Sequence, residues 1–508
     1  MLALLAGITT YITGGILSLL HSRYRFWFSL MGWSGALAGL SWGAVLFRRS
    51  GTFVGTLGLW GKLGIEIKLD QTTLLFVALV VLLNLFTLLY LGDSKRGTFY
   101  ALYNFLLAST YSMAFSHDVF NIYVTIEFMS LVAILLIGYG RKTYQIYAGV
   151  KYLLVSSLAM SLYLIGLGLI YSVGGYLKIS KLAEIMKGNM GFTLSLGLGL
   201  MVAGLAVKGG IMLFSMWLPD AHAYSGTVVS ALLSGLAIKS GLVGIIRLAE
   251  LVNWNLLWLI LGAMTGITGG VFAVLSRWPK RILAYSTISQ IGYVLLGIGA
   301  GTQAGLLAAA LNIFFHGLFK SLLFLSVGHA GVGGKDLFRD GSLSVPMESV
   351  FGLLIGTLSI LAIPPFSKYF SKTFLLEQSH RGWVWWVMLF IGLGTATYML
   401  KLNRALVVEA SREKFGDRSW PLTVFSIAVA LSSLVALVVL GKAETLALLA
   451  PGHLLLYLTL PFAALLVLLG IWKRLGELRA PDFPFNLDSA LSSVFAGFLV
   501  IELVIFLL

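Results

Sequence analysis

The sequence predicts an all-α, polytopic membrane protein of about 14–16 transmembrane helices, with two inverted five-helix repeats and broken helices 7 and 12. Of its 508 residues, 58% are hydrophobic and only 11% are charged, and the mean hydropathy is +0.94. Apolar runs of membrane-spanning length recur along the whole chain. The few charges inside these runs gather near helix interruptions or near one another, which is typical of transporters and not of a soluble core.

About sixteen runs approach the length of 17–25 residues that crosses a hydrocarbon core. They cover residues 2–20, 25–47, 71–92, 98–116, 118–139, 146–172, 193–215, 227–250, 256–276, 281–300, 304–328, 348–378, 383–402, 420–440, 452–472 and 487–508. The first run has neither a basic start nor a small-residue cleavage site, so we expect a retained helix and not a signal peptide.

The net charge of +15 does not indicate nucleic-acid binding, because the basic residues lie in short loops between the runs and form no basic domain. Loops after odd-numbered runs are richer in Lys and Arg, so the positive-inside rule places both termini outside. The longest loop, 48–70, runs against this rule. The chain has no cysteine, which excludes disulfides and iron–sulfur clusters from it, so any redox chemistry must belong to a partner.

Three charges lie deep in the runs of the first half. Glu127 is about nine residues into the fifth run, roughly 13 Å along a helix. Lys208 and Lys239 lie in the seventh and eighth runs. Gly209-Gly210 follows Lys208 directly and precedes the polar connector WLPDAHAYSG, so we expect a broken helix. A charge at bilayer depth costs at least about 2.5–3.5 kcal/mol, which makes each of these residues a candidate for function.

The second half repeats this arrangement. His316 and Lys320 are four residues apart in the eleventh run, on one helical face, where one side chain can pass a proton to the next. Pro364-Pro365 interrupts the twelfth run, and Lys372 follows the interruption. Lys368, one turn before Lys372, is expected to oppose its protonation by like-charge repulsion.

Two interrupted helices, each beside a lysine, indicate an internal repeat. We divide the chain into N-terminal helices (1–97), a first repeat (98–250), a second repeat (256–405) and C-terminal helices (406–508). Lys151, near the start of the sixth run, is close enough to the surface to reach the headgroups, and Arg277, Lys280 and Arg281 are interpreted as a cytoplasmic anchor.

These residues resemble the antiporter-like subunits shared by respiratory complex I, Mrp-type cation/proton antiporters and membrane-bound hydrogenases, over about residues 70–420. The motifs that carry the resemblance are IYVTIEFMSL, MWLPDAH, IKSGLVGIIR, KRILAYSTISQIGY, HGLFKSLLFLSVG and PPFSKYFSK. The resemblance implies a proton relay of Glu127, Lys208, Lys239, His316, Lys320 and Lys372, with no metal and no cofactor in this chain.

The chain departs from the family pattern at three places. Leu213 and Gly226-Thr227-Val228 stand where prolines are usual, and Lys368 replaces a usual glycine. The segment 473–486 is too short for the long lateral helix of the distal complex I subunit. The resemblance is therefore greatest to the Mrp-type and hydrogenase members.

The resemblance implies a proton-translocating subunit of a membrane-bound respiratory complex, either hydrogenase-type or a related complex I-like oxidoreductase, in the plasma membrane of a prokaryote. Its partners are expected to be other integral membrane subunits, including Mrp-like and redox-module subunits that carry iron–sulfur clusters and a redox metal centre. Lipid surrounds it, and no nucleic acid is involved.

Three alternatives remain. A subunit of an Mrp-type sodium/proton antiporter would need hard oxygen ligands for sodium, whereas the central positions are mostly lysines, which favours protons. A structural spacer would use its charges only to hold helices together. A solute transporter acting alone would need a polar midplane cavity, and the sequence shows a line of titratable groups more clearly than a cavity.

Overall fold

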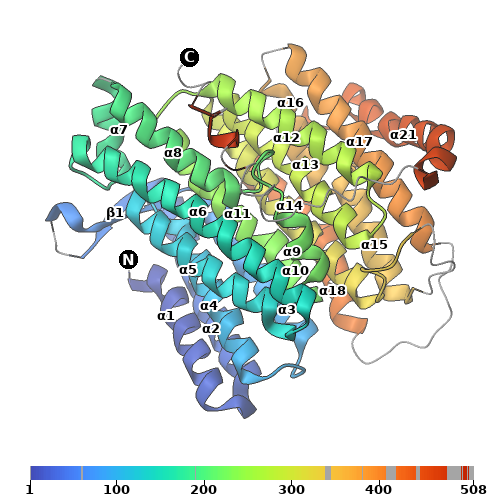
Figure 1. The fold of residues 1–508 in the computed structure, drawn as a ribbon, viewed down its shortest axis with the longest axis horizontal. Helices are drawn as coiled ribbons and strands as arrows, with labels where there is room; N and C mark the ends of the chain where they lie inside the picture. The colour runs from blue at the N-terminus through green and yellow to red at the C-terminus, as the bar shows by residue number, and fades with distance from the viewer. Residues whose placement is uncertain are drawn as a thin grey trace. The chain divides into compact units, whose positions relative to one another are not determined.

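The computed structural model is built almost entirely of helices (Figure 1). It describes residues 2–58, 61–188, 190–337, 345–379, 382–407, 419–441, 447–477, 494, 496–499 and 501–502. The predicted all-α class is confirmed, and ten of the described helices are long and apolar enough to cross a membrane by themselves. The sixteenth predicted run, 487–508, lies mostly outside the described residues, as does most of the segment 473–486.

The chain forms two compact units. Unit 1 comprises residues 1–217, 236–257 and 487–508, and unit 2 comprises residues 218–235 and 258–486. The helices of unit 1 are α1 (Leu2–Leu20), α2 (Arg25–Ser50), α3 (Gln71–Leu91), α4 (Gly97–Phe115), α5 (Val119–Ile137), α6 (Thr143–Gly174), α7 (Ile179–Gly188), α8 (Phe192–Lys208) and α11 (Ile238–Ala249). Unit 2 holds α9 (Leu218–Tyr224), α10 (Thr227–Leu232), most of α12 (Asn255–Leu275), α13 (Pro279–Gly299), α14 (Gln303–His329), α15 (Met347–Ile360), α16 (Ser367–Glu377), α17 (Gly382–Val407), α18 (Ser419–Leu431), α19 (Ser433–Leu440) and α21 (Pro451–Glu477).

Both predicted helix interruptions are present. In the first, α8 ends at Lys208, and the amides of Gly209, Gly210 and Ile211 turn back to the carbonyls of Leu205, Val207 and Ala206. Gly210 has a φ of 66°, the left-handed conformation that ends many helices. The break leaves α8 too short to count among the ten long spans.

The second interruption repeats this backbone pattern in unit 2. The helix α15 ends at Ile360, and the amides of Leu361, Ala362 and Ile363 turn back to the carbonyls of Thr357, Ser359 and Leu358. Ala362 has a φ of 61°, although it carries a Cβ that disfavours this conformation. The sequence predicts this break at the two prolines, but the helix ends before them. The same helix ending at both breaks supports an internal repeat, whose range boundaries stay a prediction.

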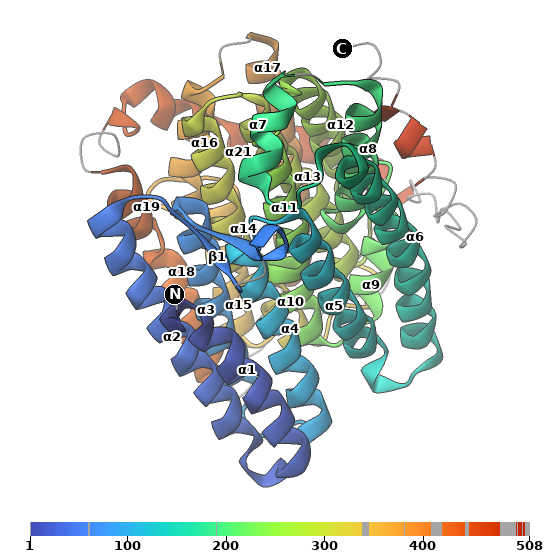
Figure 2. The same cartoon turned by 90° about the vertical axis from the view of Figure 1, so that its left-hand side faces the viewer.

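The loop 48–70 contains the one sheet that the described residues form. Strands β1 (Phe53–Leu57) and β2 (Ile65–Leu69) pair antiparallel, with Phe53 opposite Leu69 and Leu57 opposite Ile65. The hairpin lies beside α7 in unit 1 (Figure 2), and β2 also bridges to Ser116 at the end of α4. Sequence alone predicts only a loop for this segment.

Candidate functional site

Lys208 is buried at the carbonyl end of α8, where a helix favours a positive charge. Its ammonium donates a hydrogen bond of 2.6 Å to the hydroxyl of Ser130 on α5 and another to the hydroxyl of Ser156 on α6. It also lies over the ring of Tyr152, 5.6 Å from the ring centre. The lysine is therefore held by neutral oxygens and a π-face, none of which fixes it in the charged form.

Glu127 lies on α5, one turn before Ser130. Its Oε2 atom is buried and has no hydrogen-bond partner among the described residues, and the charge of the carboxylate acts on Lys208. A carboxylate in this state is costly unless a cation or a proton reaches it. The structure thus brings Glu127 and Lys208 to one site and holds the lysine on the serine next to the glutamate.

Lys239 is fully buried in α11, and glycines bring its helix against the break of α8. A Cβ on Gly241 would lie 2.6 Å from the backbone nitrogen of Gly209 and 2.8 Å from the carbonyl carbon of Lys208. Only a glycine permits this approach. Lys208 and Lys239 therefore come from two helices in backbone contact, and a π-helical segment, Leu233–Ala237, directly precedes α11, as often occurs at functional sites.

The indole of Trp217 closes the first break. Its Nε1 donates to the carbonyl of Val207 at 3.0 Å, a carbonyl in the last turn of α8 that also accepts from the amide of Gly210. The ring of Trp217 stacks on that of Tyr152, with 4.3 Å between the ring centres, and the ammonium of Lys208 lies over the same tyrosine ring. Apart from the presence of a tryptophan, no sequence signal indicates this role.

In unit 2, α14 carries a polar stripe of Asn312, His316 and Lys320, each four residues apart and fully buried. The ammonium of Lys320 donates to the carbonyl of Leu283 at 2.9 Å and to the hydroxyl of Ser286 on α13. His316 packs against the ring of Phe319. The predicted His316/Lys320 pair therefore lies on one face, and Asn312 extends it by one more turn.

Lys368 and Lys372 on α16 are both buried, and both lie over the ring of Tyr293, at 5.5 and 4.7 Å from its centre. The ammonium of Lys368 donates to the side-chain carbonyl of Asn312, and that of Lys372 donates to the backbone carbonyl of Ile360 at 3.3 Å. Ile360 stands at the second break where Lys208 stands at the first. Lys368, interpreted from sequence as an opposing charge, thus joins α16 to the polar stripe of α14.

Two other basic residues differ from their interpretation. Lys151, placed near the headgroups by sequence, is 2% exposed. Lys280, interpreted as part of an anchor, is 8% exposed and donates to the carbonyl of Ser225 at 2.7 Å. Arg281 fits the anchor better, because it is only partly buried and pairs with Asp220 at 3.4 Å.

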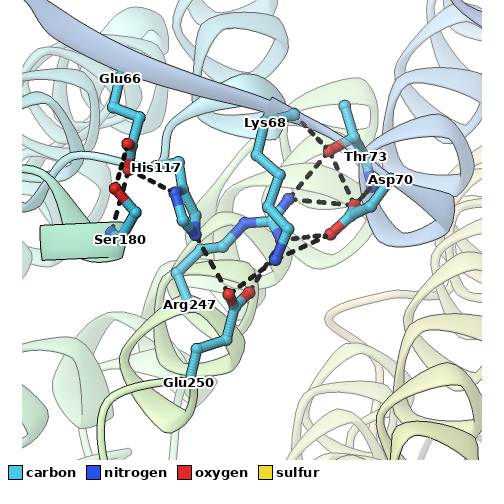
Figure 3. Close-up of polar contacts among 8 residues, drawn as sticks. All are labelled: Glu66, Lys68, Asp70, Thr73, His117, Ser180, Arg247 and Glu250. Atoms are coloured by element: carbon cyan, nitrogen blue, oxygen red, sulfur yellow. Dashed lines mark hydrogen bonds and ion pairs between the residues drawn. The ribbon is translucent and has the colours of Figure 1, made fainter. Parts of the chain in front are cut away.

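Unit 1 also holds a polar network that was not predicted from the sequence, here called the hairpin-end cluster (Figure 3). It consists of Glu66, Lys68, Asp70, Thr73, His117, Ser180, Arg247 and Glu250. Both ring nitrogens of His117 face carboxylates, Nδ1 at 2.6 Å from Glu66 Oε2 and Nε2 at 3.1 Å from Glu250 Oε2. The only signal in the sequence was a set of charges at the ends of distant runs, and nothing indicated that the hairpin brings them together.

The electrostatics of the cluster are strongly perturbed. Burial favours the neutral form of Glu250, but its hydrogen bond with His117 and the charges of Arg247 and Lys68 hold its pKa at about 2. Burial also disfavours the charged form of His117, yet its hydrogen bonds with Glu250 and Glu66 raise its pKa above the usual value. Burial raises the pKa of the neighbouring Asp118 to about 6.

The fold and these sites define a helical membrane protein with titratable residues buried at two broken helices. The model of the family NADH:quinone oxidoreductase/Mrp antiporter, TM, matches residues 116–398. The chain therefore belongs to this family of antiporter-like membrane subunits.

Curated relatives agree with this assignment. The chain is 32% identical over 365 residues to "NADH-quinone oxidoreductase subunit N" of Desulforudis audaxviator, covering 67% of this chain and 72% of the relative. It is 31% identical to a Na(+)/H(+) antiporter subunit of Alkalihalophilus pseudofirmus, covering 66% and 71%. The fold matches a chain of the membrane-bound sulfane sulfur reductase, an archaeal respiratory membrane complex, with a TM-score of 0.79 at 21% identity over 91% of this chain and 99% of that one.

Proposed function

We propose that this chain translocates protons as a subunit of a membrane-bound respiratory complex, hydrogenase-type or related to complex I, in the plasma membrane of a prokaryote. The observation that carries the proposal is the site at the first break, where Lys208 lies beside Glu127 of α5 and the helix of Lys239 contacts the end of α8. The proposed relay also includes His316, Lys320 and Lys372 of unit 2. The redox centres would belong to partner subunits, because this chain has no cysteine.

In the proposed mechanism, Lys208 alternates between two sets of partners, the serine hydroxyls and the carboxylate of Glu127. Its ammonium contacts the hydroxyls of Ser130 and Ser156, while a carboxylate oxygen of Glu127 one turn away has no hydrogen-bond partner in the described part of the chain. A rotation of the lysine toward Glu127 would form an ion pair. At about 4 Å and an effective dielectric near 20, such a pair is worth about 4 kcal/mol, enough to decide whether Lys208 keeps its proton.

In unit 2 the proton would move along the polar stripe of α14. Lys320 lies at one end of the stripe, and Asn312 at the other end accepts a hydrogen bond from Lys368. The ring of Tyr293 lies under both Lys368 and Lys372 and lowers the cost of having two cations side by side. Lys372 would deliver the proton to the far side.

The test uses vesicles that contain the whole complex. Lys208→Ala and Glu127→Ala should each abolish coupled proton movement while leaving the complex assembled, because each removes one partner of the switch. Lys142→Ala, which changes an exposed lysine at the start of α6, is the matched control and should pump normally. Normal pumping by the Lys208→Ala or the Glu127→Ala variant would overturn the relay and favour a structural spacer role.

One observation supports a second candidate. The relative named as a Na(+)/H(+) antiporter subunit is nearly as similar to this chain as the quinone oxidoreductase subunit. This chain would then work in a sodium/proton antiporter with no redox module. Purification of the intact complex distinguishes the two, because only the respiratory complex contains subunits with iron–sulfur clusters.

A further inference from the structure

The hairpin-end cluster takes no part in the proposed relay, yet it joins the ends of the two helices that carry Glu127 and Lys239. We infer that protonated His117 is a positioning residue that fixes these helix ends to the hairpin and to α7, and that its deprotonation releases them. The effect on transport rests on the proposed function, whereas the release of the hairpin does not.

The chain connectivity places the cluster at both helices. His117 is followed by Asp118, whose carboxylate caps α5 by accepting from the amides of Phe120 and Asn121. Glu127 lies further along this helix. At the other side, Glu250 follows directly on the last residue of α11, which carries Lys239 in its first turn. One histidine therefore contacts a carboxylate at the end of α11 and directly precedes the N-cap residue of α5.

The geometry around His117 requires two protons on its ring. Both nitrogens face carboxylate oxygens, and only the imidazolium form donates from both. The residue is 3% exposed, so water does not replace a lost partner. Removal of one proton would leave a ring nitrogen lone pair facing a carboxylate, and that contact would then be repulsive.

The cluster has a titratable half and a permanent half. In the permanent half, Arg247 pairs with both oxygens of Asp70, at 2.6 and 3.2 Å, and arginine keeps its charge at every physiological pH. In the titratable half, Glu66 binds His117 and accepts from the amide and hydroxyl of Ser180 at the start of α7. Loss of the proton would therefore weaken the attachment of strand β2 and α7 at Glu66, which would then depend on the backbone hydrogen bonds of His117 with Glu66 and Ile179, while Asp70 stays bound.

The direction of the pH effect follows from the pKa values. The charged and titratable groups around His117 are Glu66, Lys68 and Asp70 from the hairpin side, Asp118 from its own segment, Lys178, Lys181 and Glu184 at α7, and Arg247 and Glu250 from α11. Burial and Arg247 disfavour the imidazolium, but Glu250 and Glu66 outweigh them and raise its pKa. The contact is thus complete below about pH 6.5 and is lost as the pH rises through the raised value.

Hydrogen exchange on the intact complex tests the release directly. After correction for intrinsic exchange, opening of strands β1 and β2 should rise by up to about tenfold per pH unit between about pH 6.5 and the raised pKa of His117, because one proton is lost on opening in that interval. Opening should level off at higher pH, where His117 is already deprotonated. His117→Gln should show open-state exchange at every pH, and His117→Lys should keep the hairpin protected to higher pH. His21→Gln, which changes an exposed histidine outside the cluster, should match the wild type. Equal protection of the hairpin in wild type and His117→Gln at pH 6 would overturn the inference.

Proton movement in vesicles tests the positioning role. Wild-type translocation should fall over the same pH interval in which the hairpin opens. The His117→Gln variant should show the lower rate at every pH and therefore no such fall. Ser180→Ala should loosen the hairpin without shifting the pH profile, because it removes a contact of Glu66 and no titrating group. If the hairpin opens as the pH rises but the translocation rate does not change, His117 has no positioning role in transport. Absence of translocation in the wild type would refute the proposed function, and the exchange experiment would still decide the release.

Discussion

Individual lysines in this chain are distinguished by the oxygens around them. Lys208 has two hydroxyls, Lys320 has a carbonyl and a hydroxyl, and Lys372 has the carbonyl at the end of a broken helix. None of these oxygens belongs to a carboxylate. Deprotonation of any of these lysines would therefore leave no negatively charged hydrogen-bond partner buried and unpaired. A proton carrier needs this freedom, whereas a fixed structural charge does not.

Lys372 offers the sharpest test at this scale. Lys372→Ala should stop pumping, and Lys372→Arg should also fail because arginine does not release its proton. Lys368→Gly, which sequence alone would predict to be mild, should now impair pumping as well, because it removes the cation that binds Asn312. Proton uptake by vesicles measures all three. Normal pumping by the arginine variant would make Lys372 a fixed charge and place the exit elsewhere.

The buried charged residues could be identified from sequence because a charge inside an apolar run is conspicuous. Their partners were beyond prediction, since Ser130, Ser156 and Asn312 look like the ordinary small polar residues that membrane helices tolerate. The hairpin-end cluster was missed for a related reason. His117, Glu66 and Glu250 lie in three separate segments, and only the fold of the hairpin joins them.

At the scale of elements, the site depends on how closely α11 approaches the end of α8. Gly241→Ala would place a methyl group 2.6 Å from the backbone nitrogen of Gly209, and the helices must then separate. Such overpacking costs about 1–3 kcal/mol. We expect a lower unfolding temperature of the complex and slower proton movement.

Gly168→Ala is the matched control. A Cβ at Gly168 in α6 meets nothing within 4 Å, so alanine there should be neutral or slightly stabilising. Equal effects of the two substitutions on transport would show that the contact between α8 and α11 does not matter for the relay.

For the whole molecule, the question is which cation crosses. Sodium prefers hard oxygen ligands such as carboxylates, and the relay residues include one carboxylate, Glu127, against four lysines and a histidine. Lys239→Gln should therefore depress proton movement without altering the apparent sodium affinity of the assembly, measured by sodium titration of vesicle uptake. A shift in sodium affinity would move the sodium path into this chain.

The all-helical architecture followed from hydropathy, because each span must satisfy its own backbone in lipid. The two breaks were also expected. The helix before the second break ends at Ile360, four residues before Pro364. A proline cannot donate to the carbonyl four residues earlier and its ring crowds that carbonyl, so this end agrees with the predicted break.

The two breaks differ in which side chain donates to a carbonyl at the end of the helix. At the first break the indole of Trp217 donates to Val207, and an indole never titrates at biological pH. At the second break the donor to Ile360 is Lys372 itself. In the proposed relay Lys372 gives up its proton, and its hydrogen bond would then weaken from a charge-assisted one to a neutral one, about half as strong. The donor at the first break would stay the same at all stages of turnover, whereas the second break would loosen each time Lys372 is deprotonated and tighten when it is protonated again.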